Sequence, residues 1–217
     1  MAILCNEAGF TQRPTRKTGI MKNRWITILL LLAAGACRGP TGSVPTDHEA
    51  EAEAIYADMD IRDYSRIIEK KPGYATAYVY RGMAYIQKGD YDRAIQDFTK
   101  AIEIDPKGGS IYGKRGAAFL EIGMYEEAIR DLSKAIELYP RFAQAYLNRG
   151  NIYLHKGNYT QAVRDFTAAI EIHPGYAKAY YGRARAYQKK RLENLAAEDF
   201  RQACDLGDED ACGEALP

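Results

Sequence analysis

Apolar and polar residues alternate along this chain with the period of a helix, and the pattern is interrupted at regular points. Within residues 75–88, the residues at i, i+4 and i+7 are Tyr78, Gly82 and Tyr85, the spacing of one helix face. Gly89-Asp90 breaks the pattern, and it resumes over residues 91–104. Asp105 precedes Pro106, and a residue before proline is driven out of the helical region. The pattern therefore predicts two helices, 75–88 and 91–104, joined by a tight turn.

The same arrangement returns every 34 residues. The positions that recur include Pro72, Pro106, Pro140 and Pro174, then Tyr78, Tyr112, Tyr146 and Tyr180, and Ala94, Ala128, Ala162 and Ala196. A fixed period of this length indicates a repeat architecture in which each helix pair packs on the next. We predict an all-α array over residues 73–206, with copies at 75–108, 109–142, 143–176 and 177–208.

Glycine recurs inside the first helix of three copies, as Gly82, Gly116 and Gly150. Glycine in a helix interior costs roughly 1 kcal/mol, so its repetition indicates a gain elsewhere. Close crossing of the two helices of each pair is the physical reason, and the recurring alanines serve the same purpose on the second helix. Aromatic residues fill the space around these crossings.

These residues resemble the tetratricopeptide repeat family over residues 75–206. Tyrosine stands where that pattern has tryptophan, and Arg-Gly replaces Leu-Gly. The resemblance implies helical hairpins stacked into a right-handed superhelix, with each first helix lining the concave face. It also implies a protein that binds other proteins or peptides.

The ends depart from the repeat. In the last copy the recurring glycine, turn glycine and following aromatic become Ala184, Arg191 and Glu193. Terminal repeats are commonly atypical because one side faces solvent. Residues 48–72 look like a decayed repeat and are predicted to form degenerate N-terminal capping helices, and residues 207–217 a C-terminal cap.

Four arginines recur sixteen residues before four aspartates. The pairs are Arg81 with Asp97, Arg115 with Asp131, Arg149 with Asp165, and Arg183 with Asp199. One interpretation makes the arginines a ligand-binding series. The other pairs each arginine with the aspartate of its own hairpin as a structural ion pair, and we favour it because both members recur with the core.

The first helices differ between copies at the positions that the family geometry directs into the concave face. These residues, with two that flank the last of them, are Tyr80, Met83, Lys114, Ala117, Asn148, Asn151, Lys178, Tyr181, Gly182 and Arg185. They change from apolar to basic along the chain. Amide and amine groups can hydrogen-bond a peptide backbone, and Arg or Lys can bind a carboxylate. We predict a partner-binding groove here; the alternative is a solvated inner face with partners bound elsewhere.

The N-terminal region has the form of an export signal. Residues 21–36 contain a short basic stretch, an apolar run from Ile26 to Ala34 and small residues before Cys37. Because such signals begin at the initiator methionine, residues 1–20 are predicted to be an over-extended start. The small residues and Cys37 resemble a bacterial lipobox, which implies lipidation of Cys37 and residues 37–47 as a tether. The same residues satisfy an Ala-x-Ala cleavage site, which would release a soluble periplasmic protein.

The C-terminal cysteines are Cys204 and Cys212. Their surroundings are similar to Sel1-like repeats, in which cysteines at this spacing link the end of one helix to the start of the next. The resemblance implies a disulfide between them, in keeping with an oxidising compartment. Two free thiols are the alternative.

Composition and motif content argue against nucleic-acid binding and against enzyme activity. The net charge of +1 gives no electrostatic argument for nucleic acid. The sequence contains no nucleophile or metalloprotease motif, so we expect no enzyme activity, cofactor, metal or small-molecule substrate.

Three hypotheses of function remain. The first is a non-enzymatic adaptor in the bacterial cell envelope, lipid-anchored to the outer membrane and facing the periplasm. The second is a pilotin-like assembly factor for a pilus or secretion system. The third is an enzyme on a Sel1-like scaffold.

Overall fold

The computed structural model describes residues 47–214, with side chains from Met59 onward. The predicted start, export signal, lipidation site at Cys37 and most of the 37–47 tether lie outside the described residues. Within 47–214, no helix is both long enough and apolar enough to cross a membrane.

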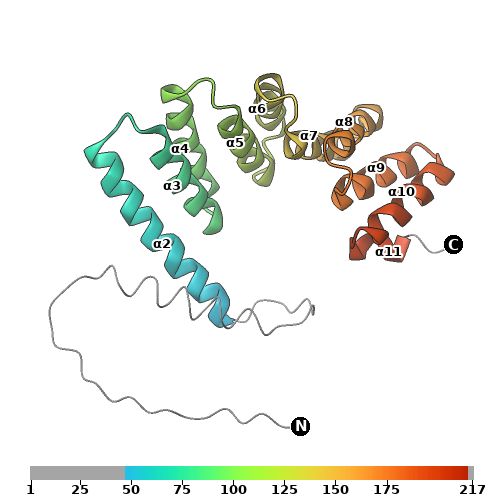
Figure 1. Ribbon diagram of the computed structural model, residues 1–217, viewed down its shortest axis with the longest axis horizontal. Helices are drawn as coiled ribbons and strands as arrows, with labels where there is room; N and C mark the ends of the chain where they lie inside the picture. The colour runs from blue at the N-terminus through green and yellow to red at the C-terminus, as the bar shows by residue number, and fades with distance from the viewer. Residues whose placement is uncertain (1–46, 215–217) are drawn as a thin grey trace, which may run out of the picture. The chain divides into compact units, whose positions relative to one another are not determined.

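The described residues are helical and follow one another as hairpins (Figure 1). A long helix, α2 (Asp47–Lys70), comes first. Four hairpins follow it: α3 (Ala75–Gln87) with α4 (Tyr91–Ile104), α5 (Gly109–Glu121) with α6 (Tyr125–Leu138), α7 (Ala143–His155) with α8 (Tyr159–Ile172), and α9 (Ala177–Lys189) with α10 (Glu193–Asp205). The short helix α11 (Glu209–Glu214) ends the array. This is the all-α hairpin array that the 34-residue period predicts.

The turn inside each hairpin needs a residue in the left-handed backbone region. Gly89, Gly123 and Gly157 supply it with φ of 73°, 76° and 76°. Glycine reaches this region at no steric cost. In the last hairpin Arg191 takes the same place with φ of 60°, so the fold is kept there despite a strained residue.

The recurring glycines mark where the two helices of a hairpin cross. A Cβ built on Gly82 would lie 2.8 Å from Cε1 of Phe98, and one on Gly150 would lie 2.9 Å from Cε1 of Phe166. Phe98 and Phe166 are among the largest fully buried side chains of the described core. The missing side chain therefore makes room for the aromatic ring of the partner helix, as the sequence indicates.

Most of the segment 48–72, predicted as capping helices, lies in the single helix α2. Its C-terminal part packs against α3, where Ile68 joins the first core cluster and the Tyr64 ring stacks on Tyr80 at 5.4 Å. This half of α2 holds the place of the second helix of a preceding hairpin.

Neighbouring first helices contact each other more closely than neighbouring second helices do, as α5 does with α7 and α7 with α9. In a curved stack, elements on the inner side lie closer together. The first helices α3, α5, α7 and α9 therefore line the inner face, which is where the predicted groove residues lie.

Candidate functional site

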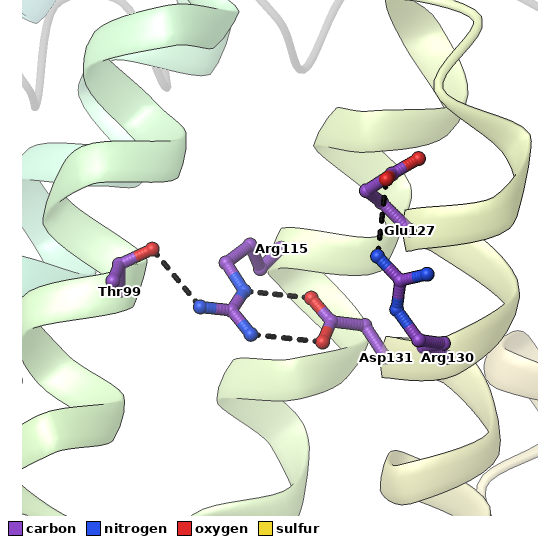
Figure 2. Close-up of polar contacts among 5 residues, drawn as sticks. All are labelled: Thr99, Arg115, Glu127, Arg130 and Asp131. Carbon is purple, nitrogen blue, oxygen red and sulfur yellow. Dashed lines mark hydrogen bonds and ion pairs between the residues drawn. The ribbon is translucent and has the colours of Figure 1, made fainter.

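Each of the four recurring arginines joins its own hairpin to the helix that precedes that hairpin. Figure 2 shows Arg115, whose Nε and Nη2 donate to the two carboxylate oxygens of Asp131 at 2.6 and 2.8 Å. Its Nη1 donates to the hydroxyl of Thr99 on α4, the second helix of the preceding hairpin, at 2.9 Å. A bidentate contact of this kind fixes the guanidinium plane as well as its charge.

The same arrangement occurs at the other three arginines. Arg81, Arg149 and Arg183 each bind their predicted aspartate with two hydrogen bonds, and the hydroxyl partners are Ser65, Ser133 and Thr167. All four predicted pairs are therefore present. Sequence reasoning missed the hydroxyl groups, although Ser65, Thr99, Ser133 and Thr167 recur every 34 residues and would have revealed them.

These groups are withdrawn from solvent. The aspartate of the second pair, Asp131, is 7% exposed, and the side chain of Arg115 is 18% exposed. Hydrogen bonds from the guanidinium groups to the aspartates raise the pKa of Arg81, Arg149 and Arg183 above the ordinary arginine value. By contrast, the nearby pair of Arg130 and Glu127 is open to solvent, with Arg130 69% exposed (Figure 2). This arrangement agrees with the structural interpretation of the interior arginines.

The N-terminal part of the inner face exposes large apolar side chains and is hollowed. Tyr80 is 47% exposed and Met83 38%, although both are large hydrophobic side chains. A hollow of about 470 Å³ lies between α3 and α5 and is lined by Tyr80, Met83 and Lys114. A second hollow, of about 450 Å³, is lined by Met83, Lys114 and Ala117. The structure thus brings the first four predicted groove residues together.

The C-terminal part of the inner face is polar and then basic. Asn148 on α7 accepts a hydrogen bond from Gln144 Nε2 at 2.8 Å, and Asn151 is exposed one turn further on. Lys178 and Arg185 are exposed on α9. They line neither of the two hollows described above, so the predicted groove consists of two chemically different stretches.

Two predicted positions contribute more to packing than to the groove. Tyr181 is half-buried, and its ring lies 5.8 Å from that of Phe200 in the core of the last hairpin. Gly182 is buried, and a Cβ there would lie 2.6 Å from the Phe166 ring. Without a side chain, Gly182 lets the Phe166 ring come close to α9, which the sequence position alone does not reveal.

The cysteines near the C-terminus form the implied disulfide. The sulfurs of Cys204 and Cys212 are 2.05 Å apart, joining the end of α10 to α11. Ala211 beside it is fully buried in the last core cluster. The link therefore holds α11 against the final hairpin.

Metal-ligating side chains do not gather in the described part of the chain. Over residues 47–214, no group of three or more His, Cys, Asp and Glu side chains is arranged to hold a metal ion.

The protein-family models that match this chain all describe the tetratricopeptide repeat. Tetratricopeptide repeat models match residues 75–107, 114–177 and 156–211. No curated protein sequence matches the chain.

Several solved structures are similar. A crystal structure of MamA is 26% identical, covers 78% of this chain and 99% of its own, and has a TM-score of 0.66. The Arabidopsis OM64 tetratricopeptide domain is also 26% identical, covering 52% of this chain and 94% of its own with a TM-score of 0.52. YrrB, described as having an unusual peptide-binding site, is 24% identical, covers 77% and 88%, and has a TM-score of 0.63; at that identity the likeness concerns the fold.

Proposed function

Because the chain belongs to the tetratricopeptide repeat family, and is a protein-interaction scaffold of that kind, we propose that it binds partner proteins through its inner face in the bacterial cell envelope. The observation that carries this proposal is the contrast between a uniform interior and a varied inner face. Four arginine contacts repeat without change, while the inner residues of the same helices differ in every hairpin. Residues that the scaffold does not require are available for recognition.

The two hollows beside Tyr80, Met83 and Lys114 are the first part of the proposed binding surface. Tyr80 and Met83 expose large apolar area on the inner face of the first hairpin, and Lys114 adds one cation to both hollows. Aromatic and methionine side chains are enriched where interfaces concentrate their binding energy. We expect this part to hold an apolar side chain of the partner.

The cell envelope is the proposed location. Support comes from the export-signal pattern of residues 21–36 and from Cys37 at the position of a lipidated cysteine. The disulfide between Cys204 and Cys212 also suits an oxidising compartment. Attachment to the outer membrane through a lipid at Cys37 is the proposed form, and a soluble periplasmic protein is the alternative. No catalytic role is proposed.

Affinity capture from membranes, with Cys37 intact, tests the proposal. The protein is compared with two inner-face variants, Tyr80→Ser with Met83→Ser and Lys114→Glu with Arg185→Glu. A matched control is Arg164→Glu with Arg201→Glu, which makes the same charge change at exposed positions of the second helices α8 and α10.

We expect the control to retain the captured proteins and at least one inner-face variant to lose them. If both inner-face variants retain every captured protein, the partners bind elsewhere and the proposal fails. Mass spectrometry of the cleaved protein tests the location separately, because lipidation at Cys37 adds acyl mass that a soluble periplasmic form lacks.

A further inference from the structure

The residue immediately before the first helix is aromatic in three hairpins and glycine in the second. Tyr74, Phe142 and Tyr176 precede α3, α7 and α9, whereas Gly108 precedes α5. These positions are spaced by 34 residues, so they are one position of the repeat. The second hairpin therefore lacks a ring that the other hairpins have.

The backbone at Gly108 does not require glycine. Its φ of −71° and ψ of 73° are close to the values at Phe142, −92° and 80°, and at Tyr176, −85° and 80°. Because aromatic residues adopt this conformation at the equivalent positions, the turn before α5 would accept one too. Glycine at this position therefore leaves space and does not serve the turn.

In the third and fourth hairpins the ring packs on the first helix of the preceding hairpin. Phe142 lies so close to α5 that a Cβ built on Gly113 would overlap its ring. Tyr176 reaches α7, where its hydroxyl donates to Oε1 of Gln144. Each ring thus fills the space between two successive first helices.

A hollow lies where the second hairpin lacks this ring. Val79 of α3 stands at the repeat position of Gly113. Thr76 of α3 stands at the repeat position of Gln144. Both residues line the hollow of about 470 Å³, and so does Gly108 itself. The chain fills this space with its own ring in the third and fourth hairpins and leaves it open in the second.

The other walls of this hollow suit an aromatic side chain. Tyr80 and Tyr139, both half-exposed, contribute two rings, and Met83 contributes a thioether. Rings gain energy from offset or edge-to-face contact with one another, and sulfur gains from contact with a ring. Asp105 and Lys114 contribute one charge of each sign, so the walls favour neither a cationic nor an anionic side chain.

We propose that this hollow receives an aromatic side chain of a partner protein. The ring of the partner takes the place against α3 that Phe142 takes against α5 and Tyr176 takes against α7. Tyrosine and tryptophan are enriched among the residues that contribute most to binding. This inference rests on the proposed use of the inner face for binding and names the side chain that is recognised there.

Short random peptides, displayed on phage and selected on the full chain in detergent, are the probe. We expect the selected peptides to share a Phe, Tyr or Trp residue. Fluorescence anisotropy of synthetic copies measures affinity. Replacing the shared residue by alanine should weaken binding by about tenfold or more, as removal of an interface anchor does. Leucine in its place should weaken binding by about threefold or more, because it cannot make the ring contacts.

Two variants fill the hollow from opposite walls, Gly108→Phe and Thr76→Tyr. A Cβ at Gly108 would lie 2.7 Å from Cδ1 of Ile111, the end of a flexible side chain that can move aside. Gly108→Ala is the first control, since it adds only a methyl group. Gly175→Phe is the second, because it makes the same change at an exposed position in the turn before α9. Circular dichroism and thermal denaturation check that each variant is folded.

We expect each filling variant to weaken peptide binding by about tenfold or more and both controls to stay within about twofold of the unchanged protein. If one filling variant does not fold, the other decides. The inference is overturned if no peptide is selected, if the selected peptides share no aromatic residue, if leucine in its place binds equally well, or if a folded filling variant binds as tightly as the unchanged protein.

These outcomes leave the proposed function standing, because partners can bind the inner face without a ring in this hollow. The proposed function fails on a different result, namely that neither inner-face variant loses any captured protein.

Discussion

Arg183 and Arg185 lie two residues apart on α9, yet they belong to different parts of the molecule. Arg183 donates to both carboxylate oxygens of Asp199, at 2.7 and 2.8 Å, and to Thr167 at 3.1 Å. Arg185 is exposed, and its guanidinium lies 5.9 Å from the centre of the Tyr181 ring. Two residues turn a helix by roughly 200°, which is enough to move a side chain from the hairpin interior to the inner face.

The repeat period alone separates the two arginines. The counterparts of Arg183 in the earlier hairpins are all arginine, whereas those of Arg185 are Asn151, Ala117 and Met83. A residue type that returns with the core serves the core, and one that changes from copy to copy is free to serve recognition. The same amino acid on the same helix can therefore have two unrelated roles.

The largest loss of stability is expected when Arg183, the interior arginine of this pair, is replaced. Arg183→Ala leaves the buried carboxylate of Asp199, 5% exposed, without its cation. Removing one partner of a buried pair costs about 3–5 kcal/mol. Arg185→Ala should change the free energy of unfolding by less than about 0.5 kcal/mol, as surface substitutions usually do. Equilibrium denaturation of both variants measures the difference, and equal losses would contradict the comparison.

A smaller loss of stability is expected when the disulfide at the C-terminal end of the array is removed. Replacing both cysteines, Cys204→Ala with Cys212→Ala, should lower the free energy of unfolding by about 2.5 kcal/mol, because the link no longer restricts the unfolded chain. Denaturation with and without reductant measures it. Reduced wild-type protein should match the double variant, and an unchanged midpoint after reduction would show that the link contributes nothing.

The hydrogen bond between Thr99 and Arg115, which links neighbouring hairpins, should contribute less to stability than the disulfide does. Thr99→Val keeps the side-chain shape but removes the hydroxyl that accepts from Arg115 Nη1 at 2.9 Å. The expected loss is about 1 kcal/mol, the usual contribution of one hydrogen bond. Thr99→Ser is the matched control, since it retains the hydroxyl. If Thr99→Val is as stable as the unchanged protein, the hydrogen bond contributes nothing to the link.

The smallest expected effect is a gain in stability at the turn of the last hairpin. Arg191 occupies the left-handed region with φ of 60°, where the other turns have glycine. Relief of this strain, less the extra freedom that glycine has when unfolded, should raise stability by about 0.5 kcal/mol in Arg191→Gly. The reciprocal change Gly157→Arg should lower it. Thermal denaturation of the two variants should show shifts of opposite sign.

Much of the fold could be predicted from the sequence because the repeat encodes it locally. The helix periods, the turn glycines and the prolines after the second helices specify the hairpins, and four copies in one phase specify the array. The arginine–aspartate pairs could also be predicted, since both members recur at one separation. The hydroxyl partners were missed because serine and threonine are common on helix surfaces, so a single one does not indicate a structural role.

The candidate groove was predicted only in part. The exposed positions of Tyr80 and Met83 follow from the helix period, but the packing of Tyr181 on Phe200 does not. Which side chain fills a gap depends on the sizes of its neighbours. Gly182 illustrates this, because its buried position is set by the Phe166 ring of α8.

The sequence by itself determined the helices, their pairing into hairpins and the residues that hold each hairpin together, because these depend on contacts between positions at fixed separations. Only the tertiary structure decided which inner residues are exposed, that Tyr80, Met83, Lys114 and Ala117 line two hollows, and that Tyr181 packs on Phe200. Those properties depend on how neighbouring hairpins pack, and the packing is set by side chains that the repeat does not fix.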